Sequence, residues 1–145
     1  MADGKIWQET INQFSSLVKK YNPQVLAGIE SRGFIFASTI GYKLGCDVIM
    51  IRKKGKLPGK TIRHFYKLEY GTDCLEIQKR ETLKNKNVVL IDDLLATGGT
   101  AGAAIKLLQK TKAKVSIFLT LIELTNLKGR KKIKVKTDSL LSFDE

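Results

Sequence analysis

Two adjacent carboxylates, Asp92 and Asp93, are followed closely by a Thr-Gly-Gly-Thr sequence at Thr97–Thr100. Carboxylate oxygens accept hydrogen bonds from the hydroxyl groups of a sugar. Glycine lets the chain turn without a Cβ penalty, and the free N–H groups at the start of a helix bind phosphate. This combination predicts a site that holds a ribose by its hydroxyls and a phosphate in the turn.

The elements around these residues fit such a site. The residues from Val88 to Ile91 form a continuous apolar run, which is typical of a strand covered on both faces in a parallel sheet. A helix with one apolar face is expected from Thr100 to Thr111. The carboxylates would then lie at the carboxyl end of a strand, where open α/β sheets bind ligands. A solvated loop is the alternative for the acidic pair alone, but the ordered combination favours a binding site.

Strand and helix patterns alternate along the rest of the chain. Helices are expected at 5–20, 33–44 and 100–111, and strands at 25–29, 47–51, 75–78, 88–91, 114–124 and 140–143. Alternation of this kind favours a parallel sheet with right-handed crossovers. The sequence therefore predicts a single α/β domain over 1–145, with a mostly parallel sheet and helices on both faces.

The net charge of +12 is concentrated in two stretches. The cations of these stretches are Arg52, Lys53, Lys54, Lys56, Lys60, Arg63 and Lys67, and then Lys128, Arg130, Lys131, Lys132, Lys134 and Lys136. Such clusters hold a polyanionic small molecule or a nucleic-acid backbone, and a solvated basic face is the alternative for the second. We expect the first stretch, 52–68, to form a flexible basic lid loop.

Composition also limits the class of protein. No apolar run among the 145 residues approaches the length of about 18 that a membrane helix needs. The opening sequence MADGKIWQET lacks the pattern of a secretory signal. Cys46 and Cys74 lie far apart and without metal-binding spacing, which indicates reduced thiols. A cytoplasmic protein without membrane contact is therefore expected.

Several stretches resemble one enzyme family. Val88–Thr100, VVLIDDLLATGGT, is similar to the phosphoribosyl pyrophosphate (PRPP) motif of the type I phosphoribosyltransferases. Stretches that resemble the adenine branch of that family are AGIESRGFIFA at Ala27–Ala37, IRKKGKLPGKT at Ile51–Thr61, YKLEYGTDCLEIQ at Tyr66–Gln78 and LIELTNLKGR at Leu121–Arg130. The resemblance implies a type I phosphoribosyltransferase-like fold and the conversion of adenine and PRPP to AMP and pyrophosphate, a purine salvage reaction. It also implies Mg²⁺, bound mainly through PRPP, pyrophosphate and water.

The same resemblance implies roles for individual residues. The ribose and 5′-phosphate of PRPP would be bound by Asp92, Asp93, Ala96, Thr97, Gly98, Gly99 and Thr100. The pyrophosphate would be bound by Glu30, Ser31, Arg32, Gly33, Arg52, Lys53 and Lys56. A cis peptide bond is implied between Glu30 and Ser31. Glu69 and Arg32 are the candidate catalytic residues, with Glu69 as general acid/base near the purine ring and Tyr70 beside it.

The resemblance leaves alternatives for the activity and the partners of this chain. The family usually carries a further segment before the first helix that forms a hood over adenine, so we expect this chain to be truncated there. A PRPP-binding regulator, or a catalytically impaired truncated paralogue of the same fold, is the alternative, including one that binds nucleic acid. Nucleic acid is disfavoured because Phe65 and Tyr66 are the only aromatic residues in the first basic stretch and the second has none. The resemblance also implies that the basic loop acts partly in the neighbouring subunit, so a homodimer is expected. Another purine as the base is a further alternative, which the LEYG sequence disfavours.

Overall fold

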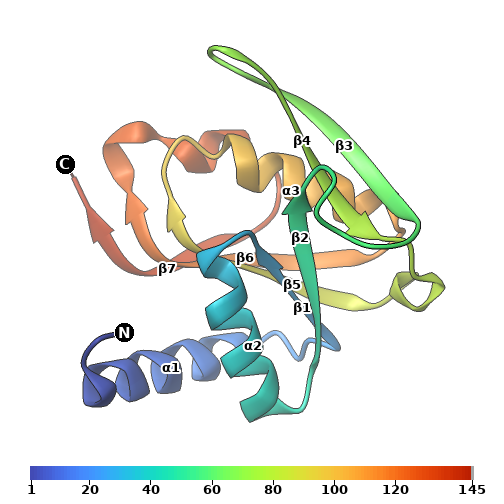
Figure 1. Cartoon of the computed structure of the whole chain (residues 1–145). Helices are drawn as coiled ribbons and strands as arrows, with labels where there is room; N and C mark the ends of the chain where they lie inside the picture. The colour runs from blue at the N-terminus through green and yellow to red at the C-terminus, as the bar shows by residue number, and fades with distance from the viewer. Residues whose placement is uncertain (145) are drawn as a thin grey trace.

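The computed structural model describes residues 1–144. The elements follow in the order α1 (Gly4–Lys19), β1 (Val25–Ile29), α2 (Arg32–Leu44), β2 (Asp47–Lys53), β3 (Thr61–Leu68), β4 (Gly71–Gln78), η1 (Glu81–Leu83), β5 (Asn87–Leu95), α3 (Gly99–Lys110), β6 (Lys114–Leu124), η2 (Thr125–Leu127), η3 (Gly129–Lys132) and β7 (Thr137–Phe143), where η denotes a short 3-10 helix. Figure 1 shows how they are arranged. The α/β class predicted from the sequence is confirmed.

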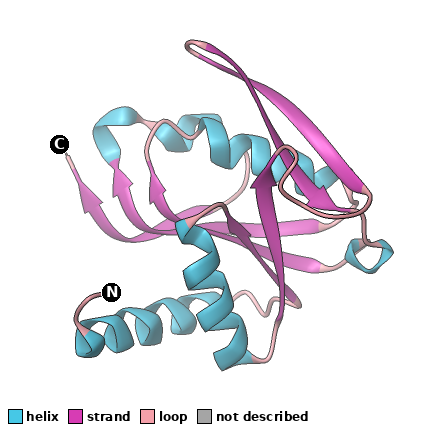
Figure 2. Cartoon of the chain, in the orientation of Figure 1, coloured by secondary structure: helices cyan, strands magenta, loops and turns pink. Residues whose placement is uncertain are grey.

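The described strands form one sheet in the order β3-β4-β2-β1-β5-β6-β7. Neighbours from β2 across to β7 run parallel, whereas β4 is antiparallel to both β2 and β3. Helices α1 and α2 lie on one face of the sheet and α3 lies on the other (Figure 2). The mostly parallel sheet with helices on both faces is therefore confirmed.

Strand β5 is buried on both of its faces. Val88 and Leu90 pack into the core beneath α3, whereas Val89 and Ile91 pack into the core beneath α1 and α2. Successive side chains of a strand point to opposite faces, so a continuous apolar run contributes to both cores. The carboxyl end of β5 is thus positioned by both layers of helices.

The strand continues further than its apolar run. β5 extends through the acidic pair to Leu95 and stays paired with β6 as far as the partners Leu95 and Glu123. Its pairing with β1, on the other side, reaches only from Val25 to Gly28 of β1 and ends at Ile91 of β5. Asp92 and Asp93 therefore lie beyond the part of β5 that pairs with β1, where the sheet opens into a cleft.

The segment 52–68 is not one loop, and that expectation was wrong for most of it. Arg52 and Lys53 end β2, and Thr61–Leu68 forms the edge strand β3, so the loop is confined to 54–60. β3 pairs with β4 along its whole length, and Ile62 and Tyr66 pack against the α3 core. This ladder and the burial of alternate side chains outweigh the repulsion between the cations of the segment.

The remaining elements differ from the expected ones only at their ends. β4 begins at Gly71, earlier than the expected 75–78, and β7 begins at Thr137, earlier than the expected 140–143. α2 ends at Leu44, as expected, and Gly45 follows it with a φ of 68°, the left-handed conformation in which glycine commonly ends a helix. In the part of the chain that the structure describes, no helix combines the length and the apolar character needed to cross a membrane.

Candidate active site

The two carboxylates at the end of β5 differ in their surroundings. The Asp92 carboxyl accepts a hydrogen bond from the N–H of Asp93 at 2.9 Å, and burial raises the pKa of Asp92 to about 8. The Asp93 carboxylate pairs with the guanidinium of Arg32, which comes from the first turn of α2. At neutral pH, Asp92 thus retains a proton and can donate a hydrogen bond, while Asp93 is balanced by a cation.

The turn after β5 is held by contacts between backbones. Gly98 has a φ of 78°, a conformation that favours glycine. A Cβ atom on Gly98 would lie 2.4 Å from the carbonyl oxygen of Gly129, and one on Gly129 would lie 2.2 Å from that of Ala96. Both positions therefore require glycine. Helix α3 begins at Gly99, so its free N–H groups face this turn.

A second close approach brings the start of α2 against β5. The peptide bond between Glu30 and Ser31 is cis, as the resemblance implied. A Cβ atom on Gly33 would lie 2.8 Å from the carbonyl oxygen of Ile91 and 3.1 Å from Oδ1 of Asp92. The absence of a side chain at Gly33 is what lets the Glu30 loop lie beside the carboxylates.

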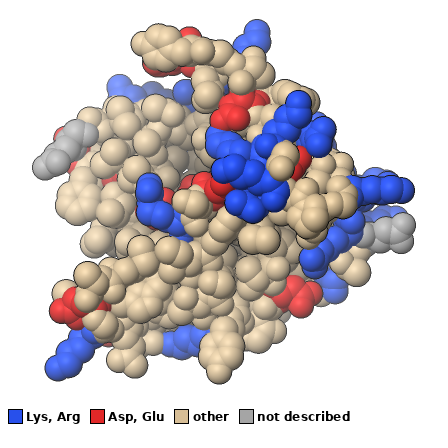
Figure 3. Space-filling view, in the orientation of Figure 1, with Lys and Arg blue, Asp and Glu red and all other residues tan. Residues whose placement is uncertain are grey.

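The carboxylate of Glu30 forms hydrogen bonds or ion pairs with three nearby basic residues. Its Oε1 accepts a hydrogen bond from Nζ of Lys56 at 2.5 Å and lies 3.6 Å from Nη2 of Arg52. Its Oε2 accepts a hydrogen bond from the backbone N–H of Lys53 at 2.8 Å. Burial alone would raise the pKa of Glu30, but the contacts with Lys56, Lys53 and Arg52 hold it below its ordinary value. Figure 3 shows basic side chains gathered at the end of β2 and over the loop that follows, with acidic ones beside them.

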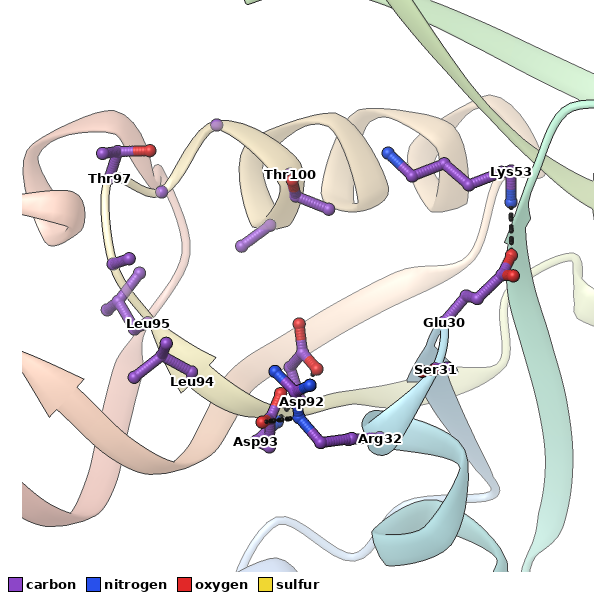
Figure 4. A pocket seen from close by; sticks show the side chains of 14 residues that line it. Glu30, Ser31, Arg32, Lys53, Asp92, Asp93, Leu94, Leu95, Thr97 and Thr100 are labelled. Atoms are coloured by element: carbon purple, nitrogen blue, oxygen red, sulfur yellow. Dashed lines mark hydrogen bonds and ion pairs between the residues drawn. The ribbon is translucent and has the colours of Figure 1, made fainter.

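One cavity of about 320 Å³ joins these groups. It is lined by Glu30, Ser31, Arg32, Lys53, Asp92, Asp93, Leu94, Leu95, Ala96, Thr97, Gly98, Gly99, Thr100 and Ala101. Figure 4 shows the carboxylates at the end of β5, with the turn on one side of them and the Glu30 loop and Lys53 on the other. The structure therefore brings most of the residues that the sequence singled out into one place.

Five predicted site residues do not line this cavity. Gly33 packs behind it, and Lys56 and Arg52 approach its edge through Glu30. Glu69 and Tyr70 lie between β3 and β4, where Tyr70 is 98% exposed. The tip of this hairpin extends beyond the rest of the molecule (Figure 1). The structure does not bring Glu69 or Tyr70 next to the carboxylates.

Three lining residues were missed by sequence reasoning. Leu94 and Leu95 lie between the acidic pair and the turn, and Ala101 lies in the first turn of α3. Apolar side chains carry no chemical signature of a ligand, so only their position inside the motif could have indicated them. They give the cavity an apolar wall beside its charged groups.

The cavity offers different binding groups along its length. The turn and the start of α3 suit a phosphate, and the Asp92 and Asp93 carboxyls suit hydroxyl groups. At the far end, Lys53 and its cationic neighbours suit a second anionic group. The arrangement fits a phosphorylated sugar that carries a further anion on its opposite side.

Comparison with known proteins points to one family. The phosphoribosyl transferase domain matches residues 4–144. The adenine phosphoribosyltransferase of Rhodospirillum rubrum is 51% identical over 144 residues, which are 99% of this chain and 84% of the relative. The structure of adenine phosphoribosyltransferase from Thermoanaerobacter pseudethanolicus has a TM-score of 0.92 and 39% identity over 98% of this chain and 83% of that one. The Saccharomyces cerevisiae enzyme, complexed with an imino-altritol 1,6-bisphosphate and adenine, has a TM-score of 0.91 and 36% identity over 97% of this chain and 82% of that one.

Proposed function

The chain belongs to the adenine phosphoribosyltransferases of the phosphoribosyl transferase domain family, and we propose that it converts adenine and PRPP to AMP and pyrophosphate. The observation that carries this proposal is the single cavity in which the acidic pair lies between a phosphate-binding turn and a cluster of cations. The yeast relative, complexed with a sugar-like bisphosphate and adenine, supports the same substrates here.

PRPP fits the cavity in one direction. Its 5′-phosphate would be bound by Ala96, Thr97, Gly98, Gly99 and Thr100 at the start of α3. Its ribose hydroxyls would be bound by Asp92 and Asp93, and the proton that Asp92 retains lets one carboxyl donate a hydrogen bond. Its pyrophosphate would then lie between Ser31, Arg32, Lys53 and the edge formed by Glu30, Lys56 and Arg52.

The cations at this end have a role in the transfer as well as in binding. Pyrophosphate gains negative charge as it leaves the sugar, so positive groups fixed beside it stabilise the transition state. Arg32 reaches the cavity from α2 and forms an ion pair with Asp93, so in the proposed orientation of PRPP it would lie between the ribose and the leaving group. We therefore propose Arg32 as a catalytic residue that balances this charge.

Completing a site for adenine requires the β3–β4 hairpin to move. Glu69 would act as general acid/base on the purine and Tyr70 would contact it, yet both lie in the β3–β4 turn outside the cavity. We propose that the tip of this hairpin closes over bound PRPP as a lid beside the loop 54–60. A lid of this kind would exclude water from the reacting carbon.

We expect Mg²⁺ to enter this site bound to the substrate. Within residues 1–144 there is no cluster of three or more His, Cys, Asp or Glu side chains that could hold a metal ion. Mg²⁺ commonly binds through one or two carboxylates together with substrate phosphates and water. We propose that oxygens of PRPP or pyrophosphate, together with water, supply most of its ligands. When bound, the ion would neutralise charge on the pyrophosphate.

Several wider features belong to the same proposal. We propose that residues 1–145 act as one phosphoribosyltransferase domain, that two copies associate as a homodimer and that the protein works in the cytoplasm. The two cysteines, Cys46 and Cys74, are free, which is compatible with a reducing compartment. Sedimentation of the purified protein tests the dimer directly, since a monomer at micromolar concentration would contradict it.

The function is tested by measuring AMP formation from adenine, PRPP and Mg²⁺. Turnover with adenine and none with hypoxanthine, guanine or xanthine is the expected result. No AMP at millimolar substrate would contradict the enzyme, and PRPP binding without AMP formation would favour the binding-protein alternative. A protein extended at its amino terminus provides the matched comparison for the adenine side of the site.

A further inference from the structure

A buried carboxylate outside the cavity lies where three strands meet. Glu76 of β4 is fully buried. It is the register partner of Arg52 on β2 and of Arg63 on β3, so the three residues form one row across antiparallel strands. Opposed residues of an antiparallel pair share a face of the sheet. The Glu76 side chain therefore lies on the face that carries Arg52 and Arg63, opposite the one that Leu75 and Ile77 bury beneath α3.

Glu76 binds the backbone of the loop 54–60. Its Oε1 accepts hydrogen bonds from the N–H of Gly55 at 3.0 Å and from the N–H of Leu57 at 3.1 Å. Its Oε2 accepts a hydrogen bond from Nε of Arg63 at 3.0 Å and a longer one from Oγ1 of Thr61 at 3.4 Å. Burial alone would raise the pKa of Glu76, but the bonds from Leu57, Arg63 and Gly55 hold it below its ordinary value.

These bonds enclose one residue of the loop. Gly55 and Leu57 are the neighbours of Lys56, and the carbonyl oxygen of Lys56 accepts a hydrogen bond from Nη1 of Arg52 at 3.2 Å. The backbone of Lys56 is thus held on both sides and at its own carbonyl group. Its ammonium group reaches Glu30 at the edge of the cavity.

We propose that Glu76 is a positioning residue, which fixes the loop so that Lys56 presents its charge to the pyrophosphate of the substrate. This inference rests on the proposed function, because it assigns Lys56 to the pyrophosphate end of the cavity. A lysine side chain has many rotamers, and holding its backbone limits where its ammonium group can lie. A carboxylate that is shared by two backbone N–H groups provides such a hold without entering the site.

The competing explanation is that Glu76 serves only the stability of the hairpin through its ion pair with Arg63. Two substitutions separate these roles. Glu76→Asp keeps the negative charge but withdraws it by one methylene from the Gly55 and Leu57 N–H groups. Glu76→Gln keeps the reach, so its carbonyl oxygen can still accept both bonds, but it loses the ion pair. Arg63→Gln removes the ion pair from the other side and serves as the matched control.

Calorimetric titration with pyrophosphate and Mg²⁺, and separately with AMP, gives the deciding readout. Glu76→Asp is expected to weaken pyrophosphate binding about tenfold, the loss of one well-placed charged contact, and to leave AMP binding unchanged. Glu76→Gln and Arg63→Gln should bind pyrophosphate more tightly than Glu76→Asp does, even where their melting temperatures are lower. The inference is overturned if Glu76→Asp loses affinity for both ligands alike, or for neither.

Amide hydrogen exchange tests the same inference without any ligand. The N–H groups of Gly55 and Leu57 should be protected in the wild type and in Glu76→Gln, and should exchange faster in Glu76→Asp. Fast exchange of both groups in the wild type would overturn the inference. A failure of the proposed function has a different signature, namely a wild type that forms no AMP while these two amides remain protected.

Discussion

Replacing Asp92 with Asn is expected to stabilise the protein, and to do so more strongly as the pH rises. The amide has the shape of the carboxyl group, and its oxygen can keep the hydrogen bond from the Asp93 N–H. The substitution removes an acid whose pKa rises from 3.8 to about 8 because it is buried. Between these two values the folded chain binds a proton that the unfolded chain does not, so wild-type stability falls as the pH rises.

The size of the effect follows from this window. The pH of 7 is about three units above the pKa of this group in the unfolded chain. Keeping the group protonated in the folded chain therefore lowers the free energy of unfolding by at most about 4 kcal/mol. Asp92 is only partly shielded from water, and solvent screening reduces that penalty. We expect Asp92→Asn to gain about 2 kcal/mol in free energy of unfolding at pH 7, or about 6 °C in Tm for a chain of this size. The gain should be small near pH 4 and vanish only below the unfolded pKa of 3.8, where the acid is protonated in both the folded and the unfolded chain.

Urea unfolding of the wild type and the variant at a series of pH values between 4 and 8 measures this difference. All other titrating groups are shared, so the difference isolates Asp92. Asp93→Asn is the comparison variant, because it keeps the acid at position 92; its stability should still fall as the pH rises, but less steeply than in the wild type, since Asp93 contributes to the raised pKa of Asp92. A difference between Asp92→Asn and the wild type that does not grow with pH, or a variant less stable than the wild type at pH 8, would refute the reasoning.

Three further predictions test other parts of the site. Glu69→Gln should lower kcat about 100-fold with little change in the KM for PRPP, and steady-state kinetics showing equal loss in both would argue against an acid–base role. Gly129→Ala would bring a Cβ atom to 2.2 Å from the carbonyl oxygen of Ala96, so AMP affinity should fall by about tenfold or more, whereas unchanged binding in calorimetry would contradict the support of the turn. Arg130→Gln leaves Glu123, which is 4% exposed, without its ion-pair partner and should cost about 3 kcal/mol in urea unfolding. A cost below about 1 kcal/mol would show that Glu123 finds other partners.

The sequence predicted the centre of the fold well because its signals there are local. The run from Val88 to Ile91 is apolar at every position, which is the pattern of a strand buried on both faces, and it contributes to both cores. Gly45 marked the end of α2 because one residue type alone adopts its conformation easily. Motif residues in the acidic pair and the turn likewise came together because they are adjacent in the chain.

What the sequence could not predict depends on partners distant along the chain. The segment Thr61–Leu68 follows a run of lysines and itself carries Arg63 and Lys67, so it was predicted as part of a basic loop; its pairing with β4 makes it a strand. The role of Glu76 was missed because the residues to which it is bonded, Gly55 and Leu57, lie about twenty positions earlier in the chain. These bonds form only when β2 and β4 pair in one particular register, which the sequence does not reveal. The positions of Glu69 and Tyr70 outside the cavity were missed for the same reason, since the hairpin geometry decides where its turn projects.

The place of β3 at the edge of the sheet gives its cations a second consequence. An outermost strand presents unpaired N–H and C=O groups, which invite pairing with strands of other molecules. β3 is such a strand, and Arg63 and Lys67 stand exposed along it. Like charges on two approaching edges repel, so these side chains oppose aggregation through this edge. Replacing Lys67, which does not take part in the ion pair between Arg63 and Glu76, with a neutral β-former would therefore be expected to reduce solubility.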